Sequence, residues 1–174
     1  MAAVMRPPVN RAYLSLGGNI GEPAKAMAAA LKLLDSDEHT TVAAVSSLYR
    51  TPPWGKTDQP DFINAAAALD TSLTPRALID LCLASERALK RERLERWGPR
   101  IIDIDILTFG DLTVDEPGLQ IPHPRMLERA FVLVPLAEIA PASRVAGKSV
   151  ANWVAGIDTA GIEKLPGGAL WWKG

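Results

Sequence analysis

Apolar and polar positions along this chain follow two periods, one of two residues and one of about 3.6 residues. Residues 10–17 alternate between apolar and polar side chains, which is typical of a half-buried strand. From Pro23 to about Ser36, apolar residues recur every three or four positions, as on one face of a helix. Proline fits the first turn of a helix, because the N–H group that it lacks would have no partner there. The chain therefore begins with a strand followed by a helix.

The same two periods continue through the middle of the chain. Residues 40–51 predict a second strand and residues 61–69 a third; the alanines of the third would also suit a helix, but no helix cap precedes them. Thr74 and Pro75 then cap a second helix. Branched residues in alternation at 101–107 predict a fourth strand.

The order strand, helix, strand, strand, helix, strand is the split βαβ pattern. It predicts a ferredoxin-like α+β fold (βαββαβ), in which an antiparallel sheet carries the helices on one face. C-terminal additions follow: a hairpin turn at 109–111 into 112–114, a turn at 115–118, a short helix at 148–158, a last strand at 162–165 and a loose tail at 171–173. The chain has 174 residues, and no linker separates two parts, so we expect one domain over 1–174.

Composition narrows the classes of protein. The formal net charge is −1, whereas a general nucleic-acid binder would more often be basic overall, so we expect no nucleic-acid partner. The single cysteine, Cys82, excludes an internal disulfide and a zinc cluster built on cysteines, and its helical spacing predicts a buried thiol. Neither an apolar run of about 18 residues nor a secretory signal is present, which predicts a cytoplasmic protein with no membrane partner. The lack of a heptad stripe makes a monomer the expectation.

The fourth strand carries the first candidate chemistry. Asp103 and Asp105 stand at i and i+2, so both carboxylates point to one face, and the core face is formed by Ile102, Ile104 and Ile106. Two adjacent carboxylates repel each other unless a cation lies between them, and hard oxygen ligands favour Mg²⁺ or Mn²⁺. The alternative is an edge strand with a solvated acidic face.

A basic segment precedes this strand and favours the metal interpretation. Residues 87–100 hold six basic side chains, five of them arginine, and only two acidic ones. Planar guanidinium groups bind phosphate oxygens in pairs, so arginines beside Mg²⁺-binding carboxylates supply what phosphoryl transfer needs. The alternative for Arg93 and Arg96 is a solvated helix face.

Four further features are candidates for binding a ligand. Phe62 and Asn64 share a strand face, which suits stacking and hydrogen bonding of a flat heterocycle, or else a core phenylalanine beside an edge amide. Trp54, in a proline-rich loop over 51–60, is either a lid or a packing anchor. The glycines of 17–21 allow positive φ and close approach of the backbone to a ligand, or form a plain turn. His123, between two prolines, is either a rigid phosphate donor or a structural loop residue.

Five motifs in order resemble those of the 6-hydroxymethyl-7,8-dihydropterin pyrophosphokinase family. The resemblance runs from about Ala12 to about Pro141, and the family's fold agrees with the one predicted above. The motifs are Leu-Gly-Gly-Asn at 16–19, Ser-Leu-Tyr-Arg-Thr-Pro-Pro at 47–53, Asp-Gln-Pro-Asp-Phe-Ile-Asn at 58–64, Arg-Trp-Gly-Pro-Arg-Ile-Ile-Asp-Ile-Asp at 96–105 and Ile-Pro-His-Pro-Arg at 121–125.

The resemblance implies transfer of a diphosphate from ATP to the hydroxymethyl group of the pterin, with release of AMP, in folate biosynthesis. ATP is then a co-substrate, and two Mg²⁺ ions are held by Asp103 and Asp105, which with Arg91 and Arg100 form the catalytic set. It implies a pterin site of Thr51, Pro52, Trp54, Phe62, Asn64 and Phe131, with the two phenylalanines sandwiching the ring. It implies an ATP site of Glu86, Arg93, Arg96, Trp97, Arg100, Ile106, His123 and Arg129.

The chain departs from the family pattern at two motif positions and at its end. Gly18 replaces the usual serine, and Lys90 replaces a usual glycine, which predicts a longer second helix. Residues beyond 160 match nothing in the family. Three alternatives stay open: a ferredoxin-like nucleic-acid-binding module, a metal-dependent phosphodiester hydrolase built on the carboxylate pair, and a family member that is fused or paired with another folate enzyme.

Overall fold

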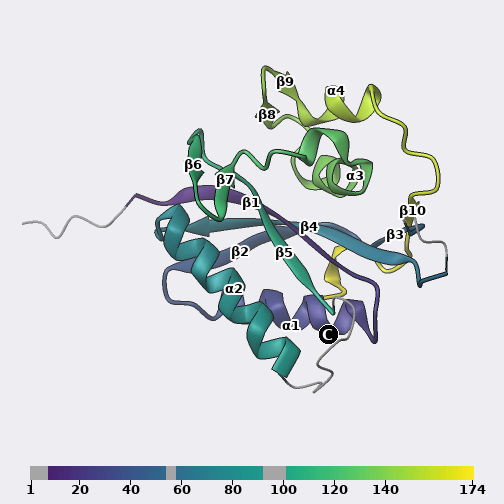
Figure 1. The fold of residues 1–174 in the computed structure, drawn as a ribbon, viewed down its shortest axis with the longest axis horizontal. Helices are drawn as coiled ribbons and strands as arrows, with labels where there is room; N and C mark the ends of the chain where they lie inside the picture. Colours follow the sequence, from purple (N-terminus) through teal and green to yellow (C-terminus); the bar gives the residue numbers. More distant parts are fainter. Residues whose placement is uncertain (1–7, 54–57, 92–100) are drawn as a thin grey trace, which may run out of the picture.

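The computed structural model describes residues 8–53, 58–91 and 101–174 of the chain. The elements expected from the hydrophobic periods are present and lie around one sheet (Figure 1). In order they are β1 (Asn10–Gly18), α1 (Pro23–Asp35), β2 (Thr40–Val45), β3 (Tyr49–Thr51), β4 (Phe62–Thr71), α2 (Pro75–Arg91) and β5 (Asp103–Phe109). With β2 and β3 together in the place of the second predicted strand, this is the βαββαβ order predicted from the sequence, which is therefore confirmed.

The sheet is antiparallel at each of its pairings and is built on β1 and β4. β1 lies between β4 and β5, with Leu14 opposite Ala67 on one side and Ile106 on the other. Along its other edge, β4 pairs first with β3 and then with β2. β10 (Glu163–Lys164) adds a last short strand outside β3, as predicted for 162–165. The ends of β1, β3, β4 and β5 thus converge at one end of the sheet.

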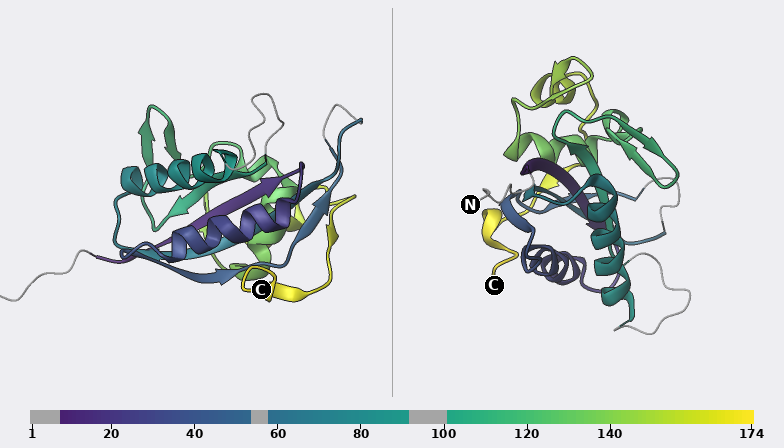
Figure 2. Two further views of the ribbon diagram at one scale, coloured as in Figure 1. Left: turned by 90° about the horizontal axis from the view of Figure 1, so that it is seen from below. Right: turned by 90° about the vertical axis from the view of Figure 1, so that its left-hand side faces the viewer.

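Helices cover both faces of the sheet (Figures 1 and 2). α1 and α2 pack on one face, where the larger apolar cluster includes Leu14, Leu16, Met27, Leu31 and Leu78. α3 (Ala130–Ile139) covers the opposite face, with α4 (Val150–Ala155) outside it, over a second cluster that includes Leu107, Met126, Leu133 and Leu136. The predicted one-sided helix layer is thus α1 and α2, and the C-terminal additions form the other layer.

Local sequence explains where α2 begins and which side it buries. The Thr74 hydroxyl accepts a hydrogen bond from the Ala77 N–H at 3.1 Å, which is the predicted N-terminal cap. Leu78 and Cys82, one turn apart, are both fully buried. Burial, with the nearby Glu86 and Asp105 charges, raises the pKa of the Cys82 thiol to about 12. The prediction of a buried thiol is confirmed.

The strand predicted over 40–51 is wrong as one element, because residues 46–48 leave the ladder. Ser46 accepts a hydrogen bond from the Ala66 N–H through its side-chain hydroxyl at 2.9 Å, and its own N–H donates to the Ala66 carbonyl at 2.8 Å. Because the Ser46 hydroxyl takes the place of a backbone acceptor, the chain can leave the ladder between β2 and β3 while the Ala66 N–H keeps a hydrogen-bond partner.

The predicted hairpin at 109–111 is also wrong. The turn forms, with Gly110 at φ +54°, but the residues after it do not return along β5. Instead β6 (Val114–Glu116) pairs with β7 (Leu119–Ile121) across a turn in which Gly118 has φ +74°. Period and turn residues mark a reversal of the chain but do not identify the strand that becomes its partner.

The predicted loose tail is wrong as well. Trp172 is only 8% exposed and belongs to the larger apolar cluster, and the Trp171 indole N–H donates to the Ser46 carbonyl at 2.8 Å. Before the tail, β8 (Arg144–Val145) and β9 (Lys148–Ser149) form a short hairpin, so the helix predicted from 148 begins at Val150. The short helix η1 (Met126–Glu128) precedes α3, and η2 (Gly168–Leu170) precedes the two tryptophans.

Candidate functional site

A cavity of about 380 Å³ lies where β1, β3, β4 and β5 end, beneath the segment from η1 to α3. It gathers eight of the residues predicted from the sequence as a binding or catalytic set. They are Thr51, Pro52, Phe62, Asn64, Asp103, Asp105, Arg129 and Phe131. Ser15, Gly17, Arg125 and Glu128 complete the lining.

Asn64 is the most constrained polar group in this cavity. It is 4% exposed, and its amide donates to the Thr51 hydroxyl at 3.2 Å across the β3–β4 ladder. On its other side is Gly17, where an added Cβ would come within 2.6 Å of the Asn64 amide oxygen. The side chain is therefore held between two strands, so its orientation in the cavity wall is set before any ligand binds.

Within the glycine stretch 17–21, Gly21 has the positive φ that the sequence allowed, at +66°. Gly17 and Gly18 do not, because they are the last residues of β1. A Cβ at Gly18 would overlap the Ile101 carbonyl. These two glycines are thus required by close packing within the sheet, against Asn64 and the entry to β5.

Asn19, next in the motif, ties β1 to the loop that precedes β4. It is 4% exposed, and its amide donates to the Gln59 side-chain oxygen at 3.0 Å and to the Pro60 carbonyl at 3.4 Å. These bonds fix the entry to β4 two residues before Phe62. The Gly-Gly-Asn motif therefore holds in place the strands β4 and β5, which carry cavity residues.

Two aromatic rings line the cavity from elements far apart in the sequence. Phe62 is the first residue of β4, and Phe131 lies in the first turn of α3. The Arg129 guanidinium lies 5.7 Å from the Phe131 ring centroid, a distance suited to a cation–π contact. The predicted aromatic pair thus shares one cavity with a cation at its margin.

The acidic pair lies on β5 as its alternation predicts. Asp103 and Asp105 are half-buried and line the cavity, while the side chains that alternate with them point into the core and are at most 4% exposed: Ile102, Ile104 and Ile106. Asp105 pairs with Ser15 of β1 and Asp103 with Gly17, and Gly17 pairs on its other side with Asn64 of β4.

A second cavity, of about 640 Å³, adjoins the first and shares Asp105 with it. It contains Ile106 and His123, both predicted on the nucleotide side. The His123 Nε2 lies 4.0 Å from the Asp105 Oδ1. Burial lowers the pKa of His123, and Arg129 and Arg125 lower it further, whereas Asp105 opposes them. The lowered pKa favours the neutral imidazole, whose ring can both donate and accept a hydrogen bond.

Glu86, also predicted to lie on the nucleotide side, is hydrogen-bonded to the backbone of β5, the strand that carries Asp103 and Asp105. Its Oε1 accepts from the Ile104 N–H at 2.7 Å, and its Oε2 lies 4.0 Å from the Lys90 ammonium. Burial raises the pKa of Glu86, and the charges of Asp103 and Asp105 raise it further. The hydrogen bond from the Ile104 N–H and the charge of Lys90 lower it, but the net shift is upward. Glu86 lines neither of these two cavities, so its position indicates support of β5.

Several predicted residues lie outside the part of the chain that the structure describes. These are Trp54, Arg93, Arg96, Trp97 and Arg100. Arg91 is the last residue of α2, but its side chain is also outside the described part. Their roles stay predictions.

Sequence reasoning did not single out three residues of the first cavity, which are Ser15, Arg125 and Glu128. Ser15 could have been found, because it lies two residues before Gly17 on the same strand face. Arg125 closes a motif that was noted, whereas nothing in the sequence singles out Glu128. Among the described residues, no group of three or more histidine, cysteine or acidic side chains could hold a metal ion. Two carboxylates nevertheless suit Mg²⁺, which keeps several waters and often takes only one or two protein ligands.

The fold and the site define a ferredoxin-like α+β protein with an aromatic cavity over a carboxylate pair. The sequence model of the 7,8-dihydro-6-hydroxymethylpterin-pyrophosphokinase (HPPK) family matches residues 13–141, so the chain belongs to the HPPK family. This confirms the resemblance that the motifs indicated.

Known relatives support the same assignment. A protein of Methylorubrum extorquens named 2-amino-4-hydroxy-6-hydroxymethyldihydropteridine pyrophosphokinase is 50% identical over 157 residues, which is 90% of this chain and 99% of that protein. One of the same name from Pseudomonas aeruginosa is 45% identical over 160 residues, 91% and 99% of the two chains. A Plasmodium falciparum HPPK-DHPS triple mutant, solved with SDX-DHP, superposes with a TM-score of 0.71 at 18% identity. That match covers 88% of this chain but only 45% of the solved one, and it bears on the fold alone.

In the part of the chain that the structure describes, no helix is both long and apolar enough to cross a membrane.

Proposed function

We propose that this protein transfers the diphosphate of ATP to the hydroxymethyl oxygen of 6-hydroxymethyl-7,8-dihydropterin, releasing AMP, as a step of folate biosynthesis. Family membership supports this reaction. The structural observation that carries it is that Asp105 lines both cavities. A carboxylate at this shared boundary suits a reaction in which an acceptor on one side meets a phosphate chain from the other.

The pterin ring is assigned to the first cavity. Phe62 and Phe131 offer apolar faces for a flat ring, and Asn64 offers a donor and an acceptor to its edge. Thr51 and Pro52 form the wall beside Asn64, and Trp54 is proposed to complete it. Because Asn64 is fixed by its bond to Thr51, the cavity selects a heterocycle whose edge carries the matching hydrogen-bonding groups.

The nucleotide is assigned to the second cavity, with Ile106 beside the base and His123 and Arg129 near the phosphates. Glu86 supports this side by holding the Ile104 N–H of β5. We assign the remaining phosphate contacts to Arg91, Arg93, Arg96 and Arg100, and a contact with the nucleotide to Trp97. Guanidinium groups suit this task because they bind two phosphate oxygens at once.

The proposed reaction is an in-line displacement at the β-phosphorus of ATP. The hydroxymethyl oxygen bonds to that phosphorus and loses its proton to water. The bond from the β-phosphorus to the oxygen that bridges it to the α-phosphorus breaks, and AMP leaves with that oxygen. No protein nucleophile takes part. The residues contribute by orienting the acceptor and by neutralising charge, which are the main sources of rate in such transfers.

Asp103 and Asp105 are proposed to hold two Mg²⁺ ions. Their common strand face, half-buried position and cavity lining fit cations that also need water and substrate oxygens. When bound, these ions neutralise the charge of the triphosphate. We also propose that the chain acts as a single domain over 1–174, as a monomer, and in the cytoplasm.

The test is AMP release by the full chain with ATP and Mg²⁺, with and without the pterin. We compare wild type with Asp105→Asn and with the control Asp111→Asn, an exposed aspartate just past the end of the same strand. Asp105→Asn should lower the pterin-dependent rate by about 100-fold or more, the usual effect of removing one stabilising group at a transferring oxyanion. The control should match wild type.

Two outcomes would contradict the proposal. AMP release at the same rate without the pterin would favour the hydrolase alternative. No pterin-dependent product from a folded wild-type protein would reject the transfer reaction itself. Binding of RNA that weakens as salt rises, without need for Mg²⁺, would then favour the nucleic-acid alternative.

A further inference from the structure

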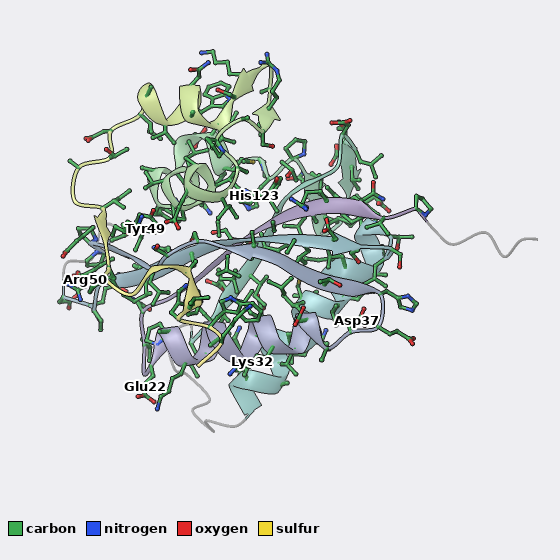
Figure 3. The ribbon with its side chains drawn as sticks, turned by 180° about the vertical axis from the view of Figure 1, so that it is seen from behind. Glu22, Lys32, Asp37, Tyr49, Arg50 and His123 are labelled. Carbon is green, nitrogen blue, oxygen red and sulfur yellow. The ribbon has the colours of Figure 1, made fainter. Side chains whose placement is uncertain are left out.

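The C-terminal segment crosses the sheet edge beside the cavity wall. We call residues 157–172 the C-terminal strap. Within it, β10 pairs with β3, with Glu163 opposite Arg50 and Lys164 opposite Tyr49. Figure 3 shows the strap passing β3 beside Tyr49 and Arg50 and continuing to α1 near Lys32. It therefore runs from the α3 layer, around the edge of the sheet, to the opposite layer.

Both ends of this crossing are fastened. Just past β10, the Leu165 N–H donates to the Leu48 carbonyl at 2.8 Å. Further on, the Trp171 indole donates to the Ser46 carbonyl at 2.8 Å, and Trp172 is buried in the larger apolar cluster. The strap thus holds the chain over residues 46–50, directly before Thr51 and Pro52.

The strap also contacts the cavity wall itself, at Pro52. Gly161 has φ +85°, and a Cβ at this position would lie 3.2 Å from the Pro52 Cγ and 3.4 Å from its Cδ. Behind the wall is a third cavity, of about 350 Å³, lined by Thr51, Pro52 and Phe131 and, from the strap, by Ile157 and Ile162. Gly161 therefore lies on the outer side of the wall whose inner side faces the first cavity.

β3 needs this outer support because it is short. It has three residues, its inner ladder to β4 has three pairs, and a Pro-Pro sequence ends it. A binding wall must be held to within about 0.5 Å for its hydrogen bonds to be selective. One strand of three residues with an unpaired outer edge would not provide that precision.

We propose that the C-terminal strap positions the pterin-binding wall, and that Gly161 sets the place of Pro52 through their close contact. The inference rests on the proposed function, because it names the pterin as the ligand that the wall contacts. Gly161 is a positioning residue and does not touch the substrate. The strap lies beyond residue 160 for most of its length, where the family motifs have ended.

The test compares two glycine variants with the same backbone strain. Gly161→Ala places a methyl group against Pro52 at φ +85°. Gly147→Ala, in the β8–β9 turn, has the same φ of +85°, but its methyl group would meet nothing within 4 Å. Any loss due to an alanine at positive φ is common to the two variants, so the difference between them reports the contact with Pro52.

Steady-state kinetics with ATP, Mg²⁺ and 6-hydroxymethyl-7,8-dihydropterin give the KM of each substrate. Gly161→Ala should raise the KM of the pterin by roughly threefold to tenfold, since a misplacement of about 1 Å costs about 100-fold and this shift is a few tenths of an ångström. The KM of ATP should stay within twofold. Gly147→Ala should change neither KM.

An unchanged pterin KM in Gly161→Ala, or an equal rise in both variants, would overturn the inference while leaving the transfer reaction in place. An inactive wild type would instead reject the proposed function. If Gly161→Ala does not fold, Trp171→Phe keeps an aromatic ring but removes the bond to Ser46 at the far end of the strap. It should raise the pterin KM at least twofold with the KM of ATP unchanged; no rise, or an equal rise in both KM values, would also overturn the inference.

Discussion

Glu138 of α3 links the C-terminal layer to the sheet through several polar contacts. Its Oε2 accepts hydrogen bonds from the Ser47 N–H at 2.9 Å and from the Ser47 hydroxyl at 3.1 Å, and its Oε1 accepts from the Tyr49 hydroxyl at 2.6 Å. The Lys164 ammonium, on β10, lies 3.7 Å from Oε1. One carboxylate thus joins α3 to residues 47–49 and to the strap.

Glu138→Gln removes the charge but keeps the length of the side chain. The amide oxygen can still accept from Ser47, and the amide NH₂ can donate to the Tyr49 oxygen. The loss is therefore mainly charge assistance, since a hydrogen bond to a charged group contributes about 1.5–3 kcal/mol and a neutral one about 0.5–1.5 kcal/mol. For three bonds to a side chain that is 22% exposed, we expect a loss of about 2 kcal/mol in the free energy of unfolding at pH 7.

The stabilisation by Glu138 depends on pH, because the pKa of its carboxyl differs between the folded and unfolded protein. Burial tends to raise the pKa of Glu138, but the hydrogen bonds from Tyr49 and Ser47 and the charge of Lys164 outweigh it, so the pKa is lowered from 4.5. The folded protein therefore binds this proton less readily than the unfolded chain. The stabilisation is present above about pH 4.5 and is lost as the pH falls through the lowered folded-state value.

Urea unfolding of wild type and Glu138→Gln should be measured at pH 7, 5, 4 and 3. The gap of about 2 kcal/mol at pH 7 should narrow toward pH 3. The control is Glu163→Gln on β10, whose side chain is 66% exposed and pairs with Arg50 at 3.6 Å; it should stay within about 0.5 kcal/mol of wild type. A gap of less than 0.5 kcal/mol at pH 7, or one that widens in acid, would refute this account of the Glu138 carboxylate.

Three further variants test other parts of the structure. Asn64→Ala should raise the KM of the pterin by about tenfold or more, since a lost hydrogen bond in a closed site costs about 1–3 kcal/mol, and binding of an ATP analogue should not change. The pKa of Glu86 is raised, so its contribution to stability is present below about pH 4.5 and falls as the pH rises through the folded-state value. The free energy of unfolding of Glu86→Gln, measured in urea, should therefore increase relative to that of wild type as the pH rises from 4 to 7. Parallel pH profiles of the two proteins would contradict this. Trp172→Ala should cost about 3–5 kcal/mol in urea unfolding, as large-to-small changes in a core do, whereas a loss below 1 kcal/mol would mean that the tail does not pack as described.

The sequence alone determined most of the sheet and one face of the site. Alternation of apolar and polar residues at period two fixes which side chains of a strand share a face, so the Asp103 and Asp105 carboxylates and the isoleucines behind them were correctly oriented. The helix starts at Pro23 and Thr74 follow from local capping chemistry, which depends only on neighbouring residues. The motifs then identified the family, because several long patterns in a fixed order are specific.

The tertiary structure decided which distant residues meet. Phe62 and Phe131 line one cavity, and His123 lies 4.0 Å from Asp105, although no local period relates these residues. The tail at 171–173 was predicted to be loose, yet the Trp171 indole N–H donates to the carbonyl of Ser46, 125 positions away. Local patterns report which side of an element is buried but not what covers it. The cover is chosen by packing of the whole chain, which brings residues together regardless of their separation in sequence.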